Sequence, residues 1–148
     1  MPDHVLLSPS RNALLGRTPP EELDRLLPSL SRVELVTGQV LYEAGAGIEH
    51  AYLIESGMIS LVMGVAGKPG SIEVGTIGRE GIVGVVAIFD HEPRSFARTM
   101  VQIPGFALRI RAADLANVSP LVPVFHKLCF RYVHATLTQA AQTAASSR

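Results

Sequence analysis

The chain has few cysteines and no excess charge of either sign. Among its 148 residues there is one cysteine, Cys129, and no tryptophan. One thiol cannot form an intramolecular disulfide, and it is too few to hold an iron-sulfur cluster or a cysteine-rich zinc site within one chain. We therefore expect a protein of the reducing cytoplasm that carries no metal.

Thirteen lysine and arginine residues balance thirteen aspartate and glutamate residues, so the formal net charge is zero. Such a chain lacks the surplus of positive charge that drives non-specific binding to nucleic acid. It also lacks an apolar run near the roughly 20 residues that cross a bilayer, and Met1–Ser10 shows no export signal. We predict no membrane partner and no DNA binding by this segment.

Recognisable catalytic patterns are missing as well. The sequence contains no nucleophile elbow, no P-loop and no HExxH helix. The five histidines lack the spacing of metal ligands; they are His4, His50, His91, His126 and His134. We predict a protein that is not an enzyme.

The glycines are concentrated in the middle of the chain. Twelve of the thirteen lie between Ser31 and Arg111, where short apolar segments alternate with turns. This arrangement is typical of an all-β barrel or sandwich. Strands are predicted at Arg32–Val36, Val40–Tyr42, His50–Ser56, Met58–Gly64, Ser71–Ile77, Arg94–Gln102 and Gly105–Ile110. The length suits one domain, which we predict to be mainly β with flanking helices.

Helices are predicted on both sides of this β region. Before it, we expect a helical turn around Asn12–Leu15 and a short helix over Thr18–Leu27, with Thr18 as the N-cap and proline in the first turn. After it, Ala112–Leu115 is predicted to form a helical turn. Ser119 and Pro120 then begin a long helix that runs to about Ser146.

The long helix carries two apolar stripes. One stripe consists of Leu121, Phe125, Leu128, Tyr132 and Ala135, and the other of Phe130, Val133, Leu137, Ala140 and Ala144. A helix packed only against its own domain needs one stripe, so the second implies another surface to bury. We predict a homodimer centred on the first stripe, with the second turned towards the β region, although the two roles could be exchanged.

The segment Gly78–Phe89, followed by Pro93–Ser95, interrupts the β pattern. Its glycines recur at three-residue intervals and allow backbone N–H groups to approach a ligand. Val85–Phe89 can form a helical turn whose N-terminus favours an anion, and Arg94 supplies a cation suited to phosphate. The pattern predicts an anion site at the Gly84–Ala87 turn.

The order of these features resembles the cyclic-nucleotide-binding domain of Crp/Fnr regulators, in which a phosphate-binding cassette lies between late strands of a β-roll. The resemblance covers nearly the whole chain. It is greatest to regulators with Gly-Arg-Glu-Gly before the cassette, Val-Gln-Ile-Pro-Gly after it and Ala-Gln-Thr-Ala in the long helix, which begin here at Gly78, Val101 and Ala141. Further landmarks are Leu41–Gly45, Ala51–Gly57, Gly84–Phe89 and Arg94–Ser95.

The resemblance implies a double-stranded β-helix, a jelly-roll-like β-roll, over residues 1–118 and a dimerisation helix over residues 119–148. Arg94 and Ser95 match the arginine and hydroxyl that hold the cyclic phosphate, and Thr138 lies near the family's purine contact. The predicted ligand residues are therefore Gly84, Val85, Val86, Ala87, Arg94, Ser95 and Thr138. Below, "the cassette" means Gly84–Phe89 together with Arg94 and Ser95.

One departure from the family pattern concerns the ligand. Family members that bind cyclic nucleotides follow the cassette glycine with a glutamate, which accepts a hydrogen bond from the ribose 2′-hydroxyl, whereas Val85 stands here. Losing one partner of a buried polar contact costs about 1–3 kcal/mol. We expect an altered small anionic effector, weak cyclic-nucleotide binding or none.

These features together predict the ligand-sensing and dimerising half of a bacterial transcription regulator. In the resembling family a winged helix-turn-helix follows the long helix, and this chain contains no recognition helix before Arg148. DNA is therefore expected to be bound only through a domain absent from this chain. The alternative is a vestigial, ligand-free module that serves dimerisation alone.

Overall fold

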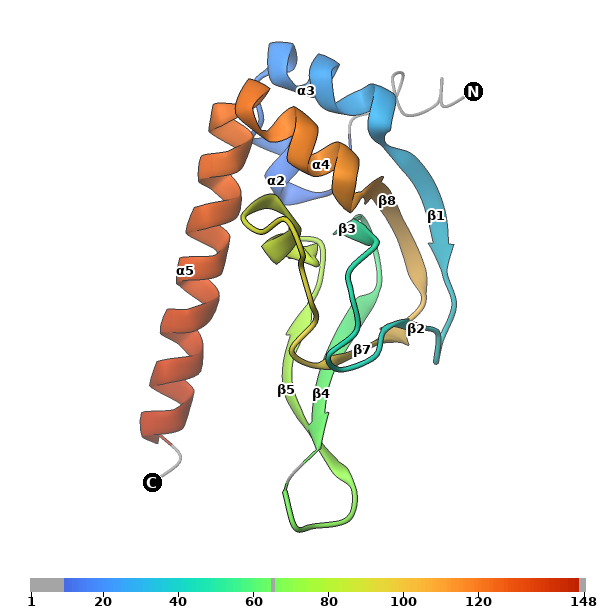
Figure 1. Ribbon diagram of the computed structural model, residues 1–148, viewed down its shortest axis with the longest axis vertical. Coiled ribbons are helices and arrows are strands. Elements are labelled where there is room, and N and C mark those ends of the chain that lie inside the picture. The colour runs from blue at the N-terminus through green and yellow to red at the C-terminus, as the bar shows by residue number, and fades with distance from the viewer. Residues whose placement is uncertain (1–9, 65, 147–148) are drawn as a thin grey trace.

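The computed structural model describes residues 10–64 and 66–146, so Met1–Pro9, where the sequence shows no export signal, lies outside the described residues. Eight strands form two antiparallel sheets (Figure 1). The strands are β1 (Ser31–Leu35), β2 (Val40–Tyr42), β3 (His50–Ile54), β4 (Met58–Gly64), β5 (Ser71–Ile77), β6 (Ile82–Val83), β7 (Arg98–Ile103) and β8 (Gly105–Arg111).

Short helices and one long helix flank the sheets. They are α2 (Ala13–Gly16), α3 (Pro20–Leu26), η1 (Leu27–Ser29), η2 (Val85–Ile88), α4 (Ala112–Val118), η3 (Ser119–Leu121) and α5 (Pro123–Ser146), where η denotes a 3₁₀ helix. In Figure 1, α2, α3 and α4 gather at one end of the roll, and the β4–β5 hairpin extends from the other end. Within the described residues, no helix is long and apolar enough to cross a membrane.

The strand order is that of a jelly roll. One sheet has the order β1-β8-β3-β6 and the other β2-β7-β4-β5, so most successive strands alternate between the two sheets. Their inner faces enclose an aliphatic core in which Leu35, Ile54, Ile59 and Leu108 are at most 1% exposed. Burying each such side chain contributes about 1.5–3 kcal/mol. The predicted mainly β roll with a long C-terminal helix is confirmed.

Seven of the eight strands coincide with predicted segments, three of them at both ends. Two differences concern the cassette. The strand predicted at Arg94–Gln102 begins at Arg98, because Arg94 makes only an isolated bridge to Gly47. Strand β6 was not predicted, because its two residues, which pair with Tyr52 and Leu53 of β3, are too few to show an alternating pattern.

Both predicted helix caps are wrong. The Thr18 hydroxyl donates to the carbonyl of Leu14 at 2.7 Å, and α3 begins after Pro19 without a side-chain cap. Ser119 lies in η3, not at the start of the long helix. Helix α5 is capped instead by the buried carboxylate of Glu22 in α3, which accepts hydrogen bonds from the N–H groups of Val124 and Phe125 at 3.0 and 2.9 Å. This side chain satisfies two of the unpaired donors at the helix start.

Helix α5 turns the first predicted stripe towards its own domain. Phe125 is fully buried, and Leu128 and Tyr132 pack against the core. The space on that side is filled by α2 and by the loop before β6, where a Cβ on Gly81 would run into the Tyr132 hydroxyl. Burial, with Glu80 nearby, raises the pKa of Tyr132 to about 12.

The remaining members of that stripe are not buried. Leu121 lies outside α5 and is 55% exposed, and Ala135 is exposed as well. The second stripe faces outward, with Phe130 exposed by 59% and Leu137 by 65%. Over the first half of α5, the first stripe therefore packs against its own domain and the second faces outward, the reverse of the predicted arrangement. From residue 134 to residue 146 the helix is exposed on every side.

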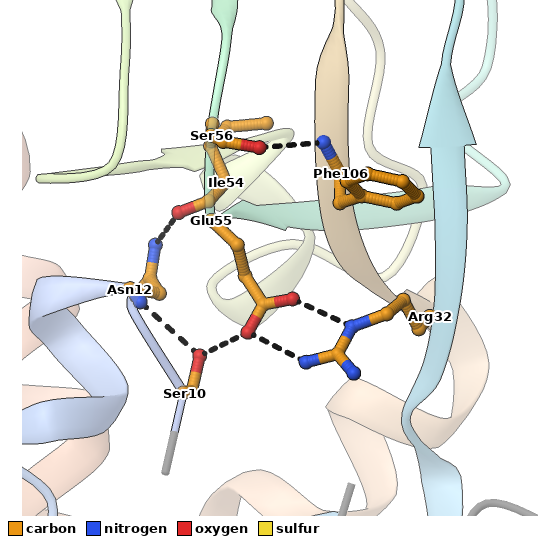
Figure 2. A network of polar contacts seen from close by, with 7 residues as sticks. All are labelled: Ser10, Asn12, Arg32, Ile54, Glu55, Ser56 and Phe106. Carbon is orange, nitrogen blue, oxygen red and sulfur yellow. Dashed lines mark hydrogen bonds and ion pairs between the residues drawn. The ribbon is translucent and has the colours of Figure 1, made fainter. Parts of the chain in front are cut away.

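A buried polar network fixes the N-terminal turn to the roll (Figure 2). Asn12 caps α2 with its side-chain oxygen, while its side-chain nitrogen donates to the carbonyls of Ile54 at 2.8 Å and Gly81 at 2.9 Å. Next to it, Glu55 accepts two hydrogen bonds from Arg32 of β1, at 2.9 and 3.1 Å, and one from Ser10 at 2.9 Å. The network therefore joins the N-terminal turn to the end of β3 through Ile54 and Glu55, to β1 through Glu55 and Arg32, and to Gly81, which precedes the cassette.

The charge of Glu55 should stabilise the fold in a pH-dependent way. Burial alone would raise the pKa of Glu55, but the hydrogen bonds from Arg32 and Ser10 hold it below the ordinary value. A lowered folded-state pKa gives stability that is complete above the unfolded-state value of about 4.3 and is lost as the pH falls through the folded-state value.

We predict that Glu55→Gln lowers the free energy of unfolding by about 2 kcal/mol at pH 7. The difference from wild type should be smaller at pH 3, below the unfolded-state pKa, because part of the charge-dependent stability is lost there. Urea denaturation followed by circular dichroism at the two pH values measures this, with the exposed Glu34→Gln on β1 as the control. A deficit of equal size at both pH values would contradict the proposed role of the charge.

Candidate functional site

The cassette begins at a backbone position that only glycine can fill. Gly84 follows β6 with φ +82°, in the left-handed region. A Cβ there would collide with the Tyr42 hydroxyl and would lie 3.3 Å from both the His50 carbonyl oxygen and the Ile48 side chain. The Tyr42 hydroxyl donates to the His50 carbonyl, and burial raises the pKa of this phenol, so it remains a donor. The entry to the cassette is thus set by close packing.

The turn after Gly84 is the predicted helical turn, but it offers fewer donors than expected. Val85–Ile88 forms the 3₁₀ helix η2, in which Ala87 is buried and its N–H donates to the Gly84 carbonyl at 3.0 Å. The N–H of Ala87 is therefore not available to an anion. Val85 and Val86, both half-buried, open the turn and have no acceptor within it.

Arg94 and Ser95 are held beside this turn by backbone pairing. Ser95 exchanges hydrogen bonds with Gly45 and Ala46, at 2.7 and 2.9 Å, and Ile48 donates to the Pro93 carbonyl at 2.8 Å. On its other side, the Ile48 side chain lies 3.3 Å from where a Cβ on Gly84 would be. Gly84 and residues 93–95 therefore lie on the two sides of Ile48, an arrangement consistent with the predicted site.

The two polar side chains of the cassette differ in availability. Arg94 is exposed, and among the described residues its guanidinium makes one hydrogen bond, to the Gly45 carbonyl at 3.0 Å. A guanidinium has five N–H donors, so most of them remain for a ligand. Ser95 is 7% exposed, and its hydroxyl donates to the Ala97 carbonyl at 2.6 Å. It can accept a hydrogen bond from a ligand but has already used its proton.

Thr138 is not brought to the cassette within one chain. Its side chain is exposed, and its hydroxyl donates to the His134 carbonyl of its own helix at 3.0 Å. Phe130, which contacts Phe89 of the cassette, lies eight residues earlier on α5, a distance of about 12 Å along a helix.

Positive charge gathers beside the start of β3. His50 lies opposite Arg111 on β8, and Arg109 lies two residues before it, opposite Tyr52. Burial and then Arg109 lower the pKa of His50, so this imidazole is neutral at pH 7. Tyr42, Ile48 and His50 were not predicted as site residues, because their role depends on packing between segments distant in the sequence. The motif Leu41–Gly45, which contains Tyr42, was the one available signal.

The structure offers neither a reactive thiol nor a cluster of metal ligands among the described residues. Cys129 is fully buried, which raises the pKa of its thiol to about 12, so the nucleophilic thiolate is absent at neutral pH. In residues 10–64 and 66–146, no three histidine, cysteine or acidic side chains gather closely enough to hold a metal ion.

The family model that matches this chain is the cyclic nucleotide-binding domain, over residues 32–119. Because the match covers more than half of the chain, the chain belongs to the cyclic nucleotide-binding domain family. This family is regulatory. No curated protein matches the sequence.

Among solved structures, Crp/Fnr-type regulators share the fold. The catabolite activator protein of Thermus thermophilus aligns with a TM-score of 0.70 and 20% identity, over 90% of this chain and 62% of its own. The c-di-GMP responsive global regulator CLP of Xanthomonas campestris aligns with a TM-score of 0.70 and 16% identity, over 84% of this chain and 62% of its own.

A structure of similar extent is the N-terminal domain of a transcriptional regulator from Streptomyces coelicolor A3(2). It aligns with a TM-score of 0.62 and 22% identity, over 90% of this chain and 92% of its own. At these identities the likeness is one of fold. The chain spans 62% of the Thermus and Xanthomonas proteins.

We predict that Gly84→Ala destabilises the fold much more than Gly67→Ala. Both glycines have positive φ, but nothing lies within 4 Å of a Cβ on Gly67, whereas Gly84 is enclosed. The left-handed backbone costs alanine about 1–2 kcal/mol at either position, and overpacking adds about 1–3 kcal/mol at Gly84. Urea denaturation at one fixed protein concentration measures both. Equal losses would show that Gly84 is not held by its neighbours.

Proposed function

We propose that this chain is the ligand-sensing and dimerising half of a cytoplasmic transcription regulator, without enzymatic activity. Residues 1–118 would sense a small anionic effector, and residues 119–148 would join two subunits. The observation that carries the proposal is Arg94, an exposed arginine with free donors that backbone pairing holds beside the ordered turn of a cyclic nucleotide-binding domain.

The chemistry of the cassette supports an anionic group at this position. Arg94 can donate two parallel hydrogen bonds to a phosphate or carboxylate. The N–H groups of Val85 and Val86 open the turn beside it, and the Ser95 hydroxyl oxygen can accept from a protonated ligand atom. Thr138 would approach such a ligand only from a second subunit or after movement of α5.

The apolar side chain of Val85 supports an effector other than a tightly held cyclic nucleotide. Its isopropyl group offers no acceptor for a ribose hydroxyl, and a pocket that leaves a buried hydroxyl unpaired loses about 1–3 kcal/mol. Cyclic AMP would therefore bind weakly, through its phosphate alone.

The exposed stripe of α5 supports dimerisation. The second stripe, extended back to the half-buried His126, recurs at alternating intervals of four and three residues, the spacing that pairs helices; its members are His126, Phe130, Val133, Leu137, Ala140 and Ala144. Phe130 and Leu137 are more than half exposed within one chain. A second copy paired along this stripe would bury them. In this proposal it takes the interface role that was first predicted for Leu121, Phe125, Leu128, Tyr132 and Ala135.

DNA contact would belong to a domain outside this chain, since the chain is neutral and spans 62% of the Thermus activator. A second candidate function is the ligand-free dimerisation module. It is favoured by Val85 and by the hydrogen bonds that turn Arg94 towards Gly45 and Ser95 towards Ala97. The two candidates differ in whether the cassette binds any anion.

We predict that the chain is a dimer and that the double variant Phe130→Asp, Leu137→Asp is a monomer, because two carboxylates would have to be buried in the interface. Sedimentation velocity over a range of concentrations measures this. The control is Phe106→Asp, Ile103→Asp, which places the same charges at positions that are 46% and 48% exposed on the roll. A wild type that remains monomeric at all concentrations would refute the dimer.

For the ligand, we predict that Val85→Glu gains at least about tenfold in affinity for cyclic AMP by calorimetry, and that adding Arg94→Ala abolishes the gain. The added carboxylate supplies the missing ribose acceptor, and Arg94 holds the phosphate. Tight binding by the wild type would show that the interpretation of Val85 is wrong. No response in any variant would favour the dimerisation module.

A further inference from the structure

One short loop contacts both halves of the cassette. Residues 43–49, which we call the support loop, connect β2 to β3. The Gly45 carbonyl of this loop accepts a hydrogen bond from the Arg94 guanidinium at 3.0 Å, and the Ile48 side chain lies 3.3 Å from where a Cβ on Gly84 would be. Among the described residues, no hydrogen bond joins Arg94 directly to the turn that Gly84 begins. The two halves of the cassette therefore meet through the support loop.

The Tyr42 hydroxyl ties the two ends of the support loop together. Tyr42 is the last residue of β2 and His50 is the first of β3, and the hydroxyl of the one donates to the carbonyl of the other. The same oxygen lies 3.4 Å from the carbonyl oxygen of Val83, at the end of β6. Tyr42 is 6% exposed, and burial raises the pKa of its hydroxyl, so the donated proton is present at neutral pH. The loop is thus closed directly beside the start of the turn.

The Tyr42 oxygen also limits the conformation of Gly84. It is the atom that a Cβ on Gly84 would strike, whereas the other nearest atoms would lie 3.3 Å away. Gly84 has φ +82°, and the peptide that follows it carries the N–H of Val85. One oxygen atom is therefore in contact both with the end of the support loop and with the backbone that directs the first N–H of the turn.

We propose that Tyr42 is a positioning residue of the anion site, whose hydroxyl sets the separation between the Arg94 guanidinium and the N–H groups of Val85 and Val86. This role rests on the function proposed above, in which one anion contacts both halves of the cassette. Donors that are already spaced for a ligand bind it more tightly, because less ordering is needed on binding. Tyr42 itself does not touch the anion, since its hydroxyl is buried and its proton is donated to His50.

Removing the Tyr42 hydroxyl while keeping its ring tests this role. Tyr42→Phe should weaken the binding of inorganic phosphate by about fivefold or more in an NMR titration of the ¹⁵N-labelled chain, because the support loop is no longer closed. The matched control is Tyr52→Phe. The two tyrosine ring centroids lie 6.2 Å apart and Tyr52 is 8% exposed, but within the described part of the chain the Tyr52 hydroxyl makes no hydrogen bond. The dissociation constant of Tyr52→Phe should equal that of the wild type.

A second control separates positioning from stability. Tyr42→Phe leaves the His50 carbonyl without its donor, so the fold should also lose stability. Gly67→Ala is destabilising because of its left-handed backbone, yet Gly67 lies in the β4–β5 hairpin and has no neighbour within 4 Å of a Cβ. It should bind phosphate like the wild type, with circular dichroism showing that each variant is folded during the titration. An equal loss of affinity in Gly67→Ala and Tyr42→Phe would overturn the positioning role.

A double-mutant cycle with Gly84 examines the same oxygen without a ligand. If the Tyr42 hydroxyl limits Gly84, then Gly84→Ala should lower the urea midpoint less in a Tyr42→Phe background than in the wild type, because the colliding oxygen is gone. Gly67→Ala should have the same effect in both backgrounds. Additive losses for Gly84→Ala and Tyr42→Phe would overturn the positioning role.

Failure of this role can be distinguished from failure of the anion site. If the wild type binds phosphate and Tyr42→Phe binds it equally well, the anion site stands and the role of Tyr42 is overturned. If the wild type does not bind phosphate, the proposed function is overturned, and the role of Tyr42 is overturned with it.

Discussion

The side-chain amide of Asn12 is the contact on which the arrangement of the site depends. Its oxygen accepts hydrogen bonds from the N–H groups of Leu14 and Leu15, which starts α2, and its nitrogen donates to the carbonyls of Ile54 and Gly81. Asn12 is 1% exposed, so none of these backbone groups could turn to water if the amide were removed. Three segments far apart in the sequence meet at this one side chain.

The long helix α5 also packs against the segment that Asn12 holds in position. Tyr132 of α5 packs on Gly81, whose carbonyl is held by Asn12, and α2 contacts α5 directly. The cassette begins three residues after Gly81. The turn that would bind an effector and the helix that would join two subunits therefore share one support at Gly81.

Most of the fold could be predicted from the sequence because the signals are local. Glycines and apolar alternation mark the turns and the longer strands, and Ser119, Pro120 and the apolar spacing mark the start of α5 within a few residues. What failed depends on distant residues. The carboxylate that caps α5 comes from Glu22, about 100 residues earlier, and periodicity reveals two apolar stripes without revealing which one α2 and Gly81 will cover.

The residues of the candidate site fall into the same two groups, those marked by a local motif and those whose role depends on contacts with distant segments. Gly84, Arg94 and Ser95 belong to a short motif, and the structure places them together around Ile48. Tyr42, His50 and Phe89 could not be assigned, because each acts through a neighbour on another element. Thr138 was predicted from the resemblance to the family's purine contact, but its distance from the cassette is set by how α5 packs.

The central claim is that the cassette binds a small anion through Arg94. The most direct measurement is an NMR titration of the ¹⁵N-labelled chain with inorganic phosphate. The account predicts saturable shifts confined to the amides of Val85 and Val86 and to the Arg94 side chain, and their loss in Arg94→Ala. Uniform shifts that do not saturate, or the same shifts in the variant, would contradict it.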